Sequence, residues 1–103
     1  MTEFCQGDII RIETFKKKSF LIVSKNSFIR ATGVFHVCPV LSAAKEGPLH
    51  IAVTGMEKQG GIVCCEQVKL IDPGARSCTK TDRIPYGEIM NISDAIQGIF
   101  EYD

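Results

Sequence analysis

The residue whose type and setting best suit chemistry is Glu66, a carboxylate inside the run of residues 60–72. This run is mostly apolar and β-branched, and it lies between a Gly-Gly pair and the turn residues Asp72-Pro73-Gly74, so it is predicted to be one strand. A carboxylate in mid-strand costs desolvation free energy unless it is paired or faces a cleft. Glu66 is a candidate general base if partial burial raises its pKa. The alternative is a structural ion pair or a solvated sheet edge.

The basic side chains that can hold an anion are Lys16, Lys17 and Lys18, consecutive in a short predicted connection between two strands. A run of like charges is commonly a solvated turn, and that interpretation stays open. The alternative is contact with phosphates, where lysine acts as a point charge without the two-pronged geometry of arginine. Arg30, in a predicted polar loop of residues 25–32, is a further candidate for the same surface.

The cysteines and histidines do not form a metal-binding pattern. There are five cysteines with no Cys-x-x-Cys spacing, and the adjacent Cys64 and Cys65 leave a strand on opposite faces. We therefore expect reduced, partly buried thiols, no zinc and no other cofactor. His36 and His50 each lie in a predicted strand, where a lone histidine is more commonly packed or at the surface than catalytic.

Composition limits the general class of the protein. The sequence has 103 residues, which suits one compact domain, and its twelve basic and twelve acidic side chains cancel. Bulk charge therefore gives no argument for nucleic acid, so any such surface must be a local patch. The apolar runs are too short to cross a membrane and the N-terminus shows no signal peptide pattern, so we expect a cytoplasmic protein.

Alternating apolar residues predict a chain of short strands followed by one helix. Pro39 inside the third strand indicates an edge position or a bulge. Helical spacing of apolar residues begins after Pro85 and continues to Phe100. The pattern favours a small, curled antiparallel barrel with a C-terminal helix, a mainly β fold. The predicted strands are residues 9–14, 20–24, 34–41, 49–53 and 60–72.

The order of these motifs resembles the PemK/MazF family of toxins from type II toxin–antitoxin systems. The matching segments are residues 7–10 (GDII), 21–24 (LIVS), 38–42 (CPVLS) and 61–72 (GIVCCEQVKLID), and the resemblance runs from about Gly7 to Phe100. It implies an SH3-like barrel, also shared by the CcdB gyrase poisons. It also implies a homodimeric, metal-independent endoribonuclease, an mRNA interferase that cuts single-stranded RNA with sequence selectivity and is inhibited by a cognate antitoxin peptide.

The resemblance also suggests site residues. Glu66 stands in place of the family's Asp, and Ser42 follows Leu41, which occupies the place of the usual Thr. Cys64 stands where some members have Arg, and the usual loop arginine is missing. The candidate catalytic residues are therefore Glu66 and Ser42, and the candidate substrate-binding residues are Lys16, Lys17, Lys18 and Arg30, with no metal ligand.

Because that arginine is missing, we expect RNA binding with weak cleavage. The alternative is a binding module of the same fold that grips RNA, an antitoxin or another protein without chemistry. A gyrase-directed poison is a third alternative, since a fold alone does not assign a target.

Overall fold

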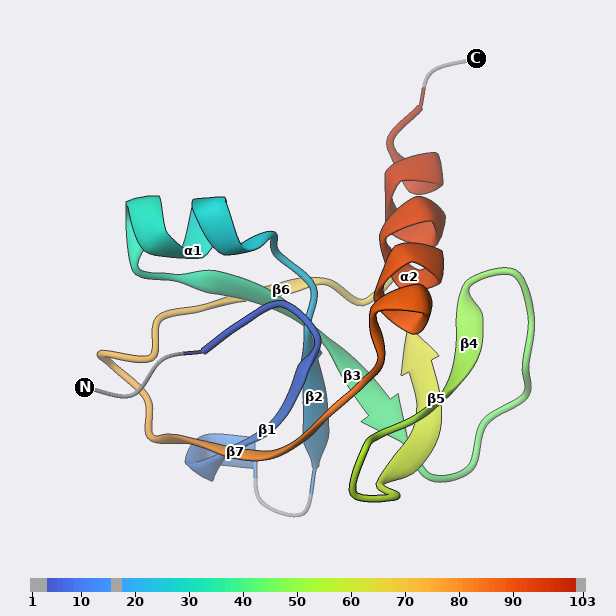
Figure 1. Cartoon of the computed structure of the whole chain (residues 1–103), viewed down its shortest axis with the longest axis horizontal. Coiled ribbons are helices and arrows are strands. Elements are labelled where there is room, and N and C mark those ends of the chain that lie inside the picture. The colour runs from blue at the N-terminus through green and yellow to red at the C-terminus, as the bar shows by residue number, and fades with distance from the viewer. Residues whose placement is uncertain (1–3, 16–17, 102–103) are drawn as a thin grey trace.

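The computed structural model describes residues 4–15 and 18–101, and it confirms a mainly β fold with a C-terminal helix (Figure 1). All strand pairs are antiparallel. The elements in chain order are β1 (Asp8–Ile12), the short 3-10 helix η1 (Glu13–Phe15), β2 (Ser19–Ile22), α1 (Asn26–Thr32), β3 (Phe35–Leu41), β4 (His50–Thr54), β5 (Gly60–Cys64), β6 (Lys69–Ile71), β7 (Cys78–Arg83) and α2 (Tyr86–Ile99).

The strands form one curled sheet in the order β4-β5-β3-β2-β1-β7, with β6 beside β3. The two faces of the sheet bury different clusters, as the alternation in the first strand predicts. Ile9 packs in the cluster that contains Ile92 of α2, whereas Ile10 and Ile12 pack with Phe35 in the other. Strand β2 lies between β1 and β3, and this central position suits a strand that is apolar on both faces.

The predicted single strand over residues 60–72 is wrong, because the chain breaks into β5 and β6 with a turn between them. Strand β3 pairs with β5 at Val40 and Leu41, and with β6 only from Val37 back to Phe35. Pro39, which has no N–H, lies in the interval between these two pairings. The predicted edge position of Pro39 is therefore also wrong, since β3 is central, but the pairing is interrupted beside it.

The predicted polar loop over residues 25–32 is also wrong, because most of it forms the helix α1. Gly33 ends this helix in the left-handed region, at φ 77°, and its N–H bonds to the carbonyl of Ile29 at 2.8 Å. The Phe28 ring lies 5.2 Å from the His36 ring, and Ile29 packs against a core cluster. Tertiary packing of these two apolar residues accounts for the helix.

The predicted C-terminal helix is confirmed as α2, with Pro85 just before its first turn. Its Ile89, Ile92 and Ile96 pack against the cluster that also contains Ile9. Among residues 4–15 and 18–101, no helix is long and apolar enough to cross a membrane.

The sheet stays open between its terminal strands, β4 and β7, and the β4–β5 turn bridges this opening. The Met56 N–H donates to the carbonyl of Arg83 at 2.8 Å. The buried Asp82 carboxylate accepts the N–H groups of Glu57 at 2.9 Å and Gln59 at 3.0 Å. Burial raises the pKa of Asp82, but its backbone hydrogen bonds outweigh this effect and lower the pKa overall.

Candidate functional site

The candidate base Glu66 lies in the turn after β5, where it meets a histidine from β4. Its Oε2 is 3.0 Å from Nε2 of His50, and the two side chains are 38% and 36% exposed. His50 is the cross-strand partner of Cys64. The turn after Cys64, closed by the Gln67 N–H bonding to the Cys64 carbonyl at 3.1 Å, carries the carboxylate to the imidazole. We call these two residues the His50–Glu66 pair.

Both ring nitrogens of His50 face oxygen acceptors, because Nδ1 also lies 3.1 Å from the carbonyl of Lys45. A neutral imidazole has one N–H and satisfies only one acceptor, whereas the imidazolium satisfies both. The hydrogen bond to Glu66 accordingly raises the pKa of His50. The same bond lowers the pKa of Glu66, so the condition that partial burial raises this pKa is not met. The pair is therefore a surface hydrogen bond in which the Glu66 carboxylate favours the protonated form of the His50 imidazole.

The cysteines near this pair are protonated thiols at neutral pH. Burial raises the pKa of Cys65 to about 11 and that of Cys38 to about 12, and it also raises the pKa of Cys64. All five cysteines of the chain are free. A thiolate nucleophile at neutral pH is not supported at any of these three positions.

Ser42 lies past the other end of β5 and contributes to a small polar cavity of 140 Å³. Ser19, at the start of β2, and Gln59, before β5, also line it. Lys18 is exposed and directly precedes Ser19, so it borders the same region. Lys16 and Lys17 lie outside the described residues.

The structure does not bring the two candidate catalytic residues together. Leu41 pairs with Ile62, so Ser42 and Glu66 are separated by about the length of β5, roughly 15 Å at about 3.3 Å per residue. Arg30 is exposed in the last turn of α1, and this helix packs on β3. The first residues of β3 pair with β6. Ser42 follows the last residue of β3. Along the length of β3, the turn that carries Glu66 therefore falls between the pairings with β5 and β6, with Ser42 and Arg30 toward opposite ends of β3, while the Glu66 carboxylate reaches β4.

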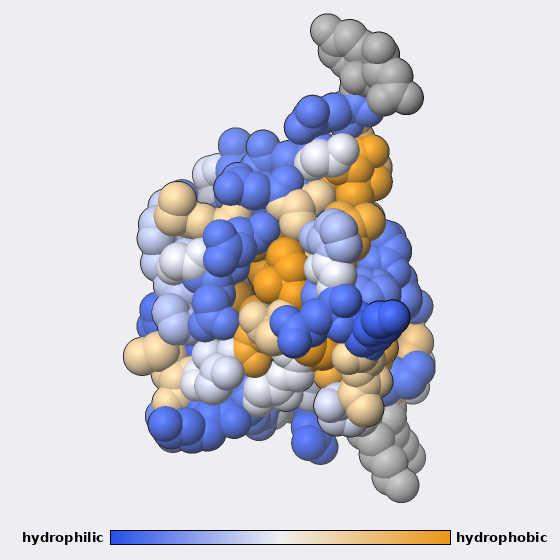
Figure 2. Space-filling view, turned by 90° about the vertical axis from the view of Figure 1, so that its right-hand side faces the viewer, coloured by the Kyte–Doolittle hydropathy of each residue, from blue (hydrophilic) through white to orange (hydrophobic). Residues whose placement is uncertain are grey.

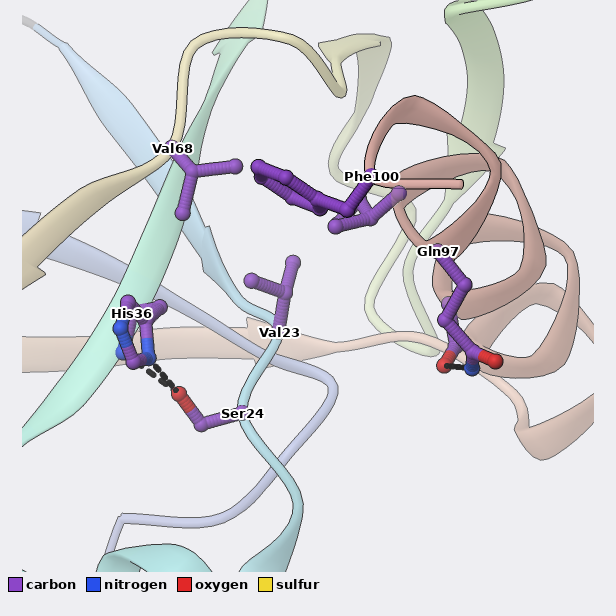
Figure 3. A pocket seen from close by; sticks show the side chains of 8 residues that line it. Val23, Ser24, His36, Val68, Gln97 and Phe100 are labelled. Atoms are coloured by element: carbon purple, nitrogen blue, oxygen red, sulfur yellow. Dashed lines mark hydrogen bonds between the residues drawn. The ribbon is translucent and has the colours of Figure 1, made fainter. Parts of the chain in front are cut away.

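A separate apolar groove of 320 Å³ lies between α2 and the sheet (Figure 3). In the close-up, Val68 and Phe100 point toward each other above Val23. The Ser24 hydroxyl accepts the His36 backbone N–H at 2.6 Å and lies 2.7 Å from Nδ1 of the same residue. Figure 2 shows apolar surface in a hollow with polar borders, on the side of the molecule that carries α2 and the β4–β5 hairpin. The sequence analysis did not predict this groove.

His50, which contacts Glu66, was not among the candidate site residues predicted from the sequence. A signal was present, because the short glycine-containing loop between residues 49–53 and the run after Gly60 favours a hairpin. In the observed hairpin His50 pairs with Cys64 and is thus near Glu66. In the described part of the chain, no three histidine, cysteine, aspartate or glutamate side chains gather to hold a metal ion.

Comparisons with known proteins agree with the fold. A family model described as PemK-like, MazF-like toxin of type II toxin–antitoxin system matches residues 6–100. A chain in a MazE–MazF crystal structure from Deinococcus radiodurans is 17% identical with a TM-score of 0.83, over 96% of this chain and 97% of that chain. An endoribonuclease from a Mycobacterial species, solved in complex with its cognate antitoxin, is 15% identical with a TM-score of 0.80, over 98% and 100%. No curated protein matches the sequence significantly.

Proposed function

This chain belongs to the PemK-like, MazF-like toxins of type II toxin–antitoxin systems, and on that basis we propose that it is an endoribonuclease that cuts single-stranded mRNA without a metal ion. One solved structure of the same fold is named as an endoribonuclease. Cleavage of RNA at a 2′-hydroxyl needs a base for that hydroxyl, a proton for the leaving 5′-oxygen and positive charge near the phosphorane. The proposal assigns the task of the base to Glu66 and places the positive charge on the lysine loop and Arg30.

The observation that carries the proposal is the exposed carboxylate of Glu66, whose Oε2 lies 3.0 Å from Nε2 of His50 and whose pKa that hydrogen bond lowers. A carboxylate that substrate can reach is in the protonation state that a base requires. Its lowered pKa makes it a weaker base than a carboxylate with a pKa near 7. Weak cleavage is therefore expected on this ground as well as from the missing loop arginine.

The RNA strand is proposed to run along β5 and β3. Lys18, with Lys16 and Lys17 of the same loop, would contact phosphates at one end, where Ser42 offers a hydroxyl. Arg30 would contact the strand at the other end, past Glu66. Phosphate contacts of this kind give affinity that falls with salt and depends little on base sequence.

A binding module without catalysis is the second candidate, and the separation of Ser42 from Glu66 favours it. A backbone separation of roughly 15 Å does not favour direct cooperation of the two residues at one phosphate within one chain. In this alternative the same surface binds RNA or an antitoxin and catalyses no reaction.

We also propose that the protein is a cytoplasmic homodimer that is inhibited by a cognate antitoxin peptide. Solved structures of the same fold are named as complexes with MazE or with a cognate antitoxin. A disordered acidic segment of the antitoxin would gain order across the lysine loop and residues 42–48, and its acidic groups would pair with the lysines.

The test is single-stranded RNA incubated with the protein in EDTA, with binding and cleavage measured separately. We expect binding by the wild type with slow cleavage. Glu66→Gln should bind equally and cut about 100-fold or more slowly, since a general base contributes roughly 10²–10⁴. Glu57→Gln, which changes an exposed carboxylate in the β4–β5 turn, is the matched control and should cut normally. Robust cutting by Glu66→Gln, or loss of all cutting in EDTA, would contradict the proposal.

A further inference from the structure

The site predicted from the sequence contains a base but lacks the arginine that would protonate the leaving oxygen. Neither the position of Cys64 nor the lysine loop has an arginine. The structure places a proton donor at this point. His50 lies opposite Cys64 on the neighbouring strand, and its Nε2 is 3.0 Å from the carboxylate of Glu66. Both side chains are more than one third exposed, so a bound strand can reach them.

We infer that His50 is the general acid of RNA cleavage and that it works as one unit with Glu66. This inference rests on the proposed endoribonuclease function and deepens it by naming the proton donor. The charge that the missing arginine would supply then comes from an imidazolium on β4.

The proposed step is cleavage of the phosphodiester by attack of the ribose 2′-oxygen on phosphorus. The Glu66 carboxylate takes the proton of the ribose 2′-hydroxyl, and the 2′-oxygen forms a bond to phosphorus. The bond from phosphorus to the 5′-oxygen breaks, and that oxygen takes a proton from His50. The products are a 2′,3′-cyclic phosphate and a free 5′-hydroxyl, and the enzyme is left with protonated Glu66 and neutral His50. Proton transfer across their 3.0 Å hydrogen bond restores the starting state.

The two proton transfers support each other electrostatically. While Glu66 is ionised, its negative charge favours the imidazolium and holds the proton on His50. Once Glu66 takes up the 2′-hydroxyl proton, that charge is neutralised, and the imidazolium becomes a stronger acid as the leaving oxygen develops charge. The other groups that face His50 are the Lys45 carbonyl, which stays neutral, and the cross-strand thiol of Cys64, whose pKa burial raises.

A purely structural role is the competing explanation, in which the pair only ties the β5–β6 turn to β4. The two roles differ in their response to the leaving group. RNA in which sulfur replaces the 5′-bridging oxygen has a leaving thiolate that needs no proton. A variant that lacks only the acid therefore recovers on this substrate, whereas a variant with a misplaced site does not.

The experiment compares wild type, His50→Gln and Glu66→Gln on normal RNA and on the 5′-thio substrate. We expect His50→Gln to cut normal RNA about 100-fold or more slowly. On the thio substrate it should cut within about tenfold of wild type, while Glu66→Gln stays slow on both. In wild type, the cleavage rate should fall as pH rises through the raised pKa of His50, above about 6.5. The pH–rate profile of His50→Gln should lack this fall. His36→Gln, which changes the other histidine, should behave as wild type, and thermal unfolding checks that each variant is folded.

The outcomes separate the two ideas. Equal losses on both substrates, or no loss on normal RNA, would overturn the role of His50 and leave RNA cleavage standing. A wild-type protein that cuts neither substrate would overturn the proposed function and the assignment of His50 with it.

Discussion

Asp82 allows a quantitative test of how the open side of the sheet is held. The residue is 4% exposed, and its carboxylate accepts the N–H groups of Glu57, Gln59 and Arg83 at 2.9, 3.0 and 2.7 Å. In Asp82→Asn one oxygen becomes an amide NH₂. Placed at Oδ2, this group meets the Gln59 N–H, so one bond is lost and the others lose their charge assistance.

The expected cost follows from those bonds. A buried hydrogen bond to a charged group is worth about 1.5–3 kcal/mol and a neutral one about 1 kcal/mol. One lost bond and two weakened bonds therefore lower the free energy of unfolding by about 3 kcal/mol, a large fraction of the roughly 5–15 kcal/mol of a whole domain. The midpoint of thermal unfolding should fall by on the order of 12 °C.

The assay is urea unfolding at several pH values, with Asp94→Asn as the control, since Asp94 is an exposed carboxylate on α2. The folded pKa of Asp82 lies below its unfolded value, so its stabilisation is complete above about pH 5 and is lost as pH falls through the folded pKa. The gap between wild type and Asp82→Asn should therefore narrow below about pH 4. A gap at neutral pH no larger than the ~0.5 kcal/mol expected of the control would refute this reasoning.

Further predictions concern packing and partners. Gly61→Ala places a Cβ 2.7 Å from Cγ1 of Val40 and 2.8 Å from the carbonyl oxygen of Leu41, so urea unfolding should show a loss of about 1–3 kcal/mol. Sedimentation should show a dimer at micromolar concentration, and a monomer alone would rule it out. Replacing Lys16–Lys18 with alanine should weaken antitoxin binding and its salt dependence, and unchanged affinity would exclude this interface.

The sequence predicts those parts of the fold that local pattern determines. Alternation in β1 places Ile9 and Ile10 on opposite faces, and the structure buries them in different clusters. Helical spacing after Pro85 predicts α2, and the glycine-containing connection between Val53 and Gly61 predicts the β4–β5 hairpin. In each case the residues that form the element are close in sequence, so no distant partner has to be known.

The errors arise where a distant element decides. Whether the chain continues as a strand after Cys64 depends on which part of β3 is free to pair with it. The pairing with β3 resumes only at Lys69, which lies opposite Val37. Helix α1 is similar, since it is short and polar in sequence and forms because Phe28 meets the His36 ring across the fold. Tertiary context outweighs local propensity at both places.

The same break in the strand explains why Glu66 was found without its partner. In the β4–β5 hairpin, Thr54 pairs with Gly60 and His50 pairs with Cys64. Residue 66 lies two positions after Cys64, so the register alone places it diagonally opposite His50. An uninterrupted strand would have kept Glu66 in the ladder. The turn instead frees its carboxylate to meet Nε2 at 3.0 Å and leaves both groups at the surface. A lone histidine and a lone carboxylate, each unremarkable in sequence, thus become a hydrogen-bonded pair through the pairing preference of β3.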